Sequence, residues 1–101
     1  PAIGEFQKAI KDPRKRFDSL SLLGECFLRK QLWDLAARQL ERALEESPGL
    51  NSEQGKRVVY NLGILREKQG DKAQAREHFL QIYEVDVSYR DVSDKVTSLS
   101  G

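Results

Sequence analysis

The feature that most constrains this chain is an internal repeat, in which one pattern of small and large apolar residues recurs along the sequence. Residues at spacings of four and then three form the pattern, which returns after 34 residues and again after a further 39. The three copies are Ala2, Phe6 and Ala9; Ala36, Leu40 and Ala43; and Ala75, Phe79 and Ile82. Spacings of four and three place residues on one face of a helix. The sequence therefore predicts an all-α chain built from recurring helical units.

A second pattern alternates with the first. It reads Leu20-x-x-Leu23-Gly24-x-x-Phe27 and, 39 residues later, Val59-x-x-Leu62-Gly63-x-x-Arg66. A glycine lets one helix approach another closely, and a small alanine at 36 and 75 does the same from the second helix. Large side chains at 40 and 79 then fill the remaining volume. We expect each pair of patterns to form two antiparallel, closely packed helices.

These patterns resemble the tetratricopeptide repeat, whose signature is W-x-x-L-G-x-x-Y, then A-x-x-x-F, A and P over 34 residues. The residues that carry the resemblance are Leu20, Leu23, Gly24, Phe27, Ala36, Leu40, Ala43 and Pro48 in the first full repeat, and Val59, Leu62, Gly63, Ala75, Phe79 and Ile82 in the second. The second repeat departs from the signature at Arg66 and Val87, and five extra residues separate the two repeats. The resemblance implies a right-handed superhelical stack of antiparallel helix pairs.

On this reading the whole chain, 1–101, is a single repeat array. Residues 1–11 are the second helix of a preceding repeat, 14–48 and 51–87 are full repeats, and 88–101 is a C-terminal capping helix. The six expected helices are 2–11, 14–29, 33–46, 52–69, 72–85 and 89–98. Because the chain starts within a repeat, we expect at least one more helix upstream, and repeat ends left open would favour self-association.

Cap residues support these boundaries. Asp12 before Pro13 is a typical helix start, and Asn51 with Gln54 and Asp71 with Gln74 resemble capping boxes. Gly70 is expected to end a helix, and Ser88 with Asp91 to begin the last one. On that last helix, Tyr89, Val92, Val96 and Leu99 share one face.

The composition excludes several functions. Seventeen basic and 16 acidic residues give a net charge of +1, so no general attraction to nucleic acid or to an anionic membrane is expected. We interpret the one basic cluster, Lys8 to Arg16, as solvated surface. No apolar run approaches the roughly 20 residues of a membrane span, so no membrane insertion is expected.

Catalysis and metal binding are not expected either. Cys26 and His78 are the only cysteine and histidine, too few for a metal site with three or four ligands, and no cofactor motif is present. We expect Cys26 to be inert, His78 to lie at the surface or at a core boundary, and Trp33 to pack at the start of its helix. A single cysteine excludes an internal disulfide and weakly favours a reducing, cytoplasmic location.

By resemblance, the first helices of the repeats line a concave groove that holds a partner segment. The groove residues implied here are Asp18, Ser21, Glu25, Leu28 and Arg29 in the first full repeat, and Arg57, Tyr60, Asn61, Ile64, Glu67 and Lys68 in the second, with Asp91, Asp94 and Ser98 joining from the last helix. Apolar anchors beside basic groups suit a partner with apolar residues and some acidic character. Glu25 would repel a carboxylate, so we do not expect binding of chaperone C-termini.

The function that follows is a non-catalytic protein-interaction module, an adaptor or assembly scaffold in the bacterial style. It predicts binding that Tyr60→Ala or Arg57→Glu abolishes while the fold stays intact. Two alternatives stay open, namely a structural self-association unit and the regulatory arm of a larger enzyme or of a secretion or pilus complex.

Overall fold

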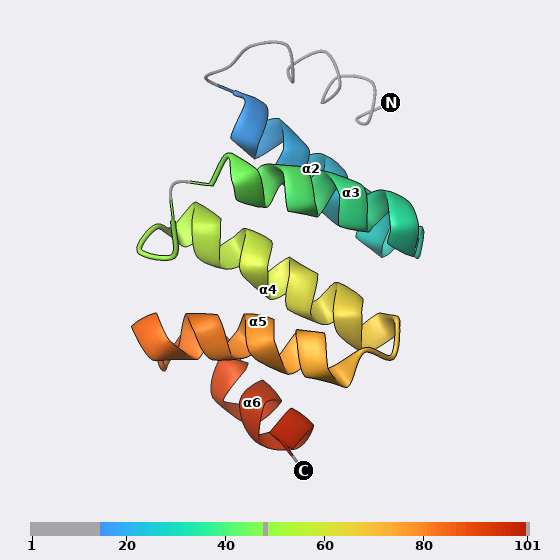
Figure 1. Ribbon diagram of the computed structural model, residues 1–101. Coiled ribbons are helices and arrows are strands. Elements are labelled where there is room, and N and C mark those ends of the chain that lie inside the picture. The colour runs from blue at the N-terminus through green and yellow to red at the C-terminus, as the bar shows by residue number, and fades with distance from the viewer. Residues whose placement is uncertain (1–14, 48, 101) are drawn as a thin grey trace. The chain divides into compact units, whose positions relative to one another are not determined.

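A computed structural model describes residues 15–47 and 49–100 of the chain (Figure 1). Within these residues the secondary structure consists of five helices and no strand, which confirms the all-α prediction. The helices are α2 (Arg16–Arg29), α3 (Trp33–Glu45), α4 (Glu53–Lys68), α5 (Lys72–Val85) and α6 (Val92–Ser100). The expected helix 2–11, the Asp12–Pro13 start, Pro48 and most of the basic cluster lie outside the described residues.

The chain divides into two compact units, and each is described by itself. The first ends at Ser47 and contains the antiparallel pair α2 and α3. The second begins at Pro48 and contains α4, α5 and α6, in which α5 packs against both other helices. Each unit therefore contains one of the helix pairs expected from the two full repeats.

In the first unit, the apolar faces of α2 and α3 meet at a glycine. A Cβ atom added to Gly24 would lie 2.6 Å from both Cγ and Cδ2 of Leu40, so the helices come as close as glycine allows. The buried apolar side chains here are Leu20, Leu23, Ala36, Ala37, Leu40 and Ala43. Phe27, at the aromatic position of the repeat, is half-buried.

The C-terminus of α2 has a conformation that the sequence does not predict. Gln31 adopts a left-handed conformation with φ 62°, its N–H donates to the carbonyl of Leu28, and the N–H of Leu32 donates to that of Phe27. These two bonds form a Schellman motif, which usually places glycine at the left-handed position. Helix α4 ends in the same motif with Gly70 there at φ 82°, as Gly70 was expected to do.

The second unit repeats the glycine contact with an aromatic ring. A Cβ atom on Gly63 would lie 2.6 Å from both Cε1 and Cζ of Phe79. Around it lies a core of Val59, Ala75, Phe79, Ile82, Tyr89 and Val92, with Leu50, Tyr60, Ile64, Tyr83, Val96 and Leu99 packed against it. Val58 and Leu65 of α4 are fully buried as well, although the repeat pattern does not mark them.

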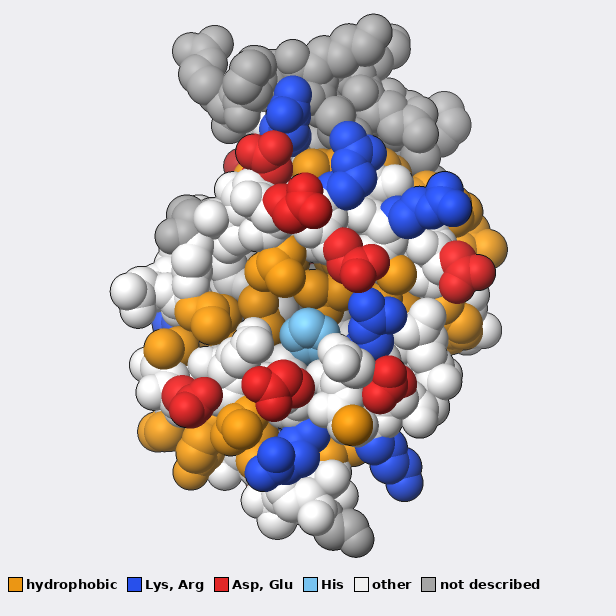
Figure 2. Space-filling view, in the orientation of Figure 1, with side chains coloured by type: hydrophobic (Ala, Val, Ile, Leu, Met, Phe, Trp, Pro, Cys, Tyr) orange, Lys and Arg blue, Asp and Glu red, His pale blue; other side chains and the backbone are white. Residues whose placement is uncertain are grey.

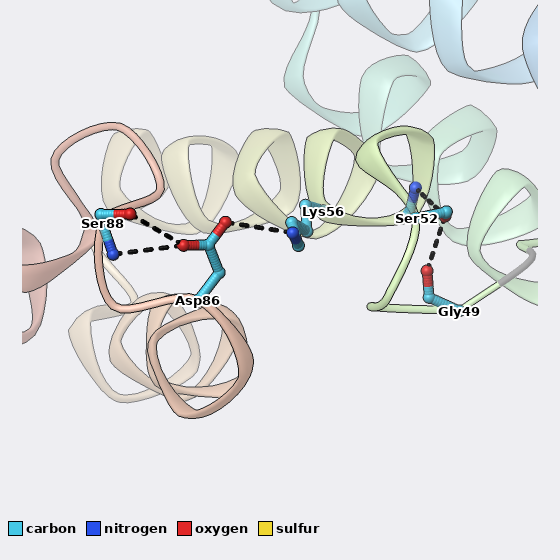
Figure 3. A network of polar contacts seen from close by, with 6 residues as sticks. Gly49, Ser52, Lys56, Asp86 and Ser88 are labelled. Atoms are coloured by element: carbon cyan, nitrogen blue, oxygen red, sulfur yellow. Dashed lines mark hydrogen bonds and ion pairs between the residues drawn. The ribbon is translucent and has the colours of Figure 1, made fainter.

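Two predicted helix starts need correction. Ser52, rather than Asn51, caps α4, because its Oγ accepts a hydrogen bond from the N–H of Gly55 at 3.0 Å (Figure 3). Ser88 does not start the last helix, since its N–H and Oγ both donate to the carboxylate of Asp86 and hold a turn. Helix α6 begins only at Val92, after that turn. Asp71 does cap α5, accepting from the N–H of Gln74.

Candidate functional site

The best-defined candidate site lies in the second unit, around Tyr60 on α4. Its ring meets the edge or face of two other rings, with centroids 5.5 Å from Phe79 and 6.0 Å from Tyr89. Its hydroxyl donates a hydrogen bond of 2.6 Å to Oδ1 of Asp91, just before α6. Tyr60 therefore links α4, α5 and the turn that leads to α6, and it is held in one orientation.

These surroundings keep the Tyr60 hydroxyl protonated. Burial, together with the hydrogen bond to Asp91 and the negative charge of that carboxylate, raises the pKa of Tyr60 from 10.0 to about 12. At neutral pH the hydroxyl thus remains a donor to Asp91. Burial also raises the pKa of Tyr89.

Arg90 completes this cluster. Its guanidinium carbon lies 4.9 Å from the centroid of the Tyr60 ring and 5.4 Å from that of Tyr89, within the range of cation–π attraction. The residue is exposed and adopts φ 43°, in the left-handed region that non-glycine residues seldom occupy. We call Tyr60, Tyr89 and Arg90 the aromatic–arginine cluster.

Two ion pairs flank this cluster. Nζ of Lys95 on α6 lies 2.8 Å from Oε1 of Glu67 on α4, and both side chains are about three-quarters buried. Nζ of Lys56 lies 3.0 Å from Oδ2 of Asp86, whose other oxygen accepts from Ser88 (Figure 3). The hydrogen bonds from Lys56 and Ser88 lower the pKa of the Asp86 carboxyl. The α4 surface is thereby joined to α6 and to the α5–α6 turn.

The expected groove residues of the second unit differ in how exposed their side chains are. Asn61 is 8% exposed, and its buried Nδ2 finds no acceptor among the residues that the structure describes. Arg57 and Ile64 are half-buried, and Lys68 is exposed. Glu67 is engaged by Lys95. Of the residues expected from the last helix, Asp91, Asp94 and Ser98 are exposed.

The expected groove residues of the first unit also differ in exposure. Asp18 and Arg29 are exposed, Glu25 and Leu28 are half-buried, and Ser21 is 6% exposed. Ser21, like Asn61, contributes little to the accessible surface.

The structural role of Tyr60 corrects one expectation. Tyr60→Ala would remove two ring contacts and the bond to Asp91, so it would not leave the fold unperturbed. Sequence reasoning also missed Arg90, Lys95 and Asp86, because it placed the site on the first helices of the repeats. The run Tyr89-Arg90-Asp91 was the available signal, since it puts an arginine between an aromatic and an acidic residue.

Other chemistry finds little support in the described part of the chain. No group of three or more His, Cys, Asp and Glu side chains in residues 15–47 and 49–100 could hold a metal ion. Cys26 is a half-buried free thiol, and His78 and Trp33 are half-buried. No helix that the structure describes has both the length and the apolar character needed to cross a membrane.

Comparison with known proteins agrees with this architecture. A family model described as tetratricopeptide repeat matches residues 15–86, which include α2, α3, α4 and α5. No match was found among curated proteins. The chain therefore belongs to the tetratricopeptide repeat family, whose repeats serve in general as protein-interaction modules.

Proposed function

We propose that this chain is an adaptor or scaffold that binds a segment of another protein along the exposed surface of α4, the first helix of the second full repeat, with the Tyr60–Ile64 stretch as the main contact. One observation carries this proposal. Two large side chains, Tyr60 and Ile64, are only half-buried although the core lies directly beneath them. Such partly covered apolar groups are the usual anchors of protein interfaces.

Preorganisation supports the same surface. Tyr60 is held by Asp91 and two rings, and Glu67 by Lys95, so these side chains lose little rotamer freedom when a partner binds. Ordering a flexible side chain costs about 0.5–1.5 kcal/mol at an interface. Lys68, exposed at the end of α4, supplies a cation at the rim, where charge affects mainly the association rate.

A capture experiment with a matched control tests this proposal. The double variant Ile64→Ser/Lys68→Glu changes one apolar and one basic residue of the α4 surface. The control Val85→Ser/Lys72→Glu likewise changes one β-branched apolar residue to serine and one lysine to glutamate, at exposed positions of α5. Each protein is checked for helix content and then used to capture partners from lysate of the source cells.

We expect the wild type and the α5 control to capture the same partner protein. The α4 variant should fail to capture it. Equal recovery by all three proteins would refute the assignment of this surface. A crosslink between that partner and α4 would add direct support.

Self-association is a second candidate, favoured by exposed apolar side chains in the first unit. Leu32 and Leu35 are 43% and 40% exposed, and with Gln31, Trp33 and Asp34 they line an open depression of about 400 Å³. Light scattering over a range of concentrations tests it. Oligomers that disappear in Leu32→Lys/Leu35→Lys would support self-association, whereas a monomer at all concentrations would exclude it.

A further inference from the structure

Arg90 differs from the other cations around Tyr60 because nothing in the described structure accepts its hydrogen bonds. Lys56 is paired with Asp86, and Lys95 with Glu67. The carboxylate beside Arg90 in the chain, Asp91, accepts the hydroxyl of Tyr60 instead. Within residues 15–47 and 49–100, the interactions of Arg90 are the two contacts with the rings of Tyr60 and Tyr89.

This arrangement leaves the donors of Arg90 available while its position is defined. The guanidinium carries its N–H donors in one plane, and its contacts with the two rings hold its position without engaging a hydrogen-bond acceptor of the described residues. The backbone adds a second constraint, because a left-handed non-glycine residue persists only where its surroundings hold it. Arg90 therefore presents an exposed guanidinium, a planar fork of N–H donors, whose position is defined by contacts with two ordered rings.

The chemical group that fits such a fork best is a carboxylate, which accepts two parallel hydrogen bonds from one guanidinium. We propose that Arg90 recognises the side-chain carboxylate of an aspartate or glutamate in the partner segment, and so determines which segments bind. The inference rests on the proposed function and names the partner chemistry at that same surface.

A side chain is favoured over a chain terminus as the source of this carboxylate. Glu53 and Asp91 carry negative charge near the two tyrosines, so a carboxylate is attracted only at the fork itself. A side chain can reach that point while its main chain stays over the apolar Tyr60–Ile64 stretch. A terminal carboxylate would bring the partner main chain itself close to Asp91.

The test is a selection of binding peptides on the whole chain. Random peptides displayed on phage, once with a free and once with a blocked C-terminus, are selected against the wild type, Arg90→Gln, Arg90→Lys and Arg38→Gln. Arg38 is an exposed arginine of α3, so Arg38→Gln makes the same charge change outside the cluster. Circular dichroism confirms the helix content of each variant.

We expect wild type and Arg38→Gln to select Asp or Glu at a constant distance from an apolar residue, with either form of C-terminus. Arg90→Gln should keep the apolar preference and lose the acidic one. Arg90→Lys keeps the charge without the planar fork, so its acidic preference should fall at least severalfold. Binding of one selected peptide should weaken about tenfold when its acid becomes the amide, equivalent to about 1.4 kcal/mol.

Four results would overturn the inference. Apolar peptides without an acidic preference would refute the role of Arg90 while leaving the proposed function intact. The same acidic preference in Arg90→Gln would place recognition elsewhere, and enrichment that requires a free C-terminus would replace the side chain by a terminal carboxylate. Failure of the wild type to select any peptide would remove the proposed function as well.

Discussion

At the scale of single residues, two glycines control how closely the helices of each pair approach. A Cβ on Gly63 would strike the ring of Phe79, and a Cβ on Gly24 would strike the side chain of Leu40, each at 2.6 Å. An aromatic ring is rigid and cannot fold away from the intruding atom, whereas a leucine can change rotamer. The same sequence feature thus has different consequences in the two units.

We expect Gly63→Ala to destabilise the protein by up to about 2 kcal/mol. Overpacking costs about 1–3 kcal/mol, while alanine regains about 1 kcal/mol of helix propensity. Gly24→Ala should cost less, since Leu40 can move. Denaturant unfolding followed by circular dichroism measures both changes, and Phe79→Leu should be less harmful in Gly63→Ala than in the wild type. A stabilised Gly63→Ala would show that the close contact is absent.

Tyr60 makes the stability of the folded protein pH-dependent in the alkaline range. Its pKa is about 12 in the folded protein and 10.0 in the unfolded reference. The stabilisation is fully present below pH 10, because both states are then protonated. It declines between pH 10 and about 12 as the unfolded chain loses its proton first. Unfolding measured across this range should therefore show a steeper loss for wild type than for Tyr60→Phe, which retains only the contribution of Tyr89. Equal slopes would contradict the raised pKa of Tyr60.

At the scale of helices, capping decides where α4 begins. Ser52 Oγ accepts from Gly55 N–H and donates to the carbonyl of Gly49, so one hydroxyl joins the helix to the preceding turn (Figure 3). Asn51 is exposed and precedes this cap. The two neighbouring residues therefore offer a direct comparison.

We expect Ser52→Ala to lower the free energy of unfolding by about 1 kcal/mol, the usual cost of losing an N-cap. Asn51→Ala should change it by less than about 0.5 kcal/mol, as at most surface positions. Thermal unfolding of both variants checks this difference. A larger effect of Asn51→Ala would show that Asn51 is the N-cap of α4, as the capping-box pattern indicated.

At the scale of the whole molecule, charge is balanced rather than concentrated. On the face shown in Figure 2, acidic and basic side chains are interspersed. With a net charge of +1 at pH 7 and an isoelectric point of about 8.4, the protein carries little charge to keep copies apart. We expect a solubility minimum near pH 8.4, measured as the protein remaining in solution after equilibration at each pH. A solubility that does not vary with pH would indicate that apolar contacts govern association.

Much of the fold could be predicted because local patterns and the repeat agree. Spacings of three and four placed the buried faces of α3 and α5 correctly, and Gly70 and Asp71 marked a helix end and the next start, since these signals act within one helical turn. The start of α4 was displaced because two neighbouring residues could each cap it, and the start of α6 was displaced because Ser88 bonds to Asp86 and holds a turn instead. The candidate site was harder to predict. The repeat pattern assigns a residue to a helix face, but it does not indicate which other side chains cover that face.

The sequence by itself determined the helical class, the pairing of helices and the close approach at Gly24 and Gly63, because each depends on residue size and on periodicity along the chain. Only the tertiary structure decided that Asn61 is buried, that Tyr60 supports the core, and that Arg90 lies over two tyrosine rings. Those outcomes depend on contacts between residues about thirty positions apart, such as Tyr60 and Asp91, whose geometry follows from how α4, α5 and the turn before α6 pack together.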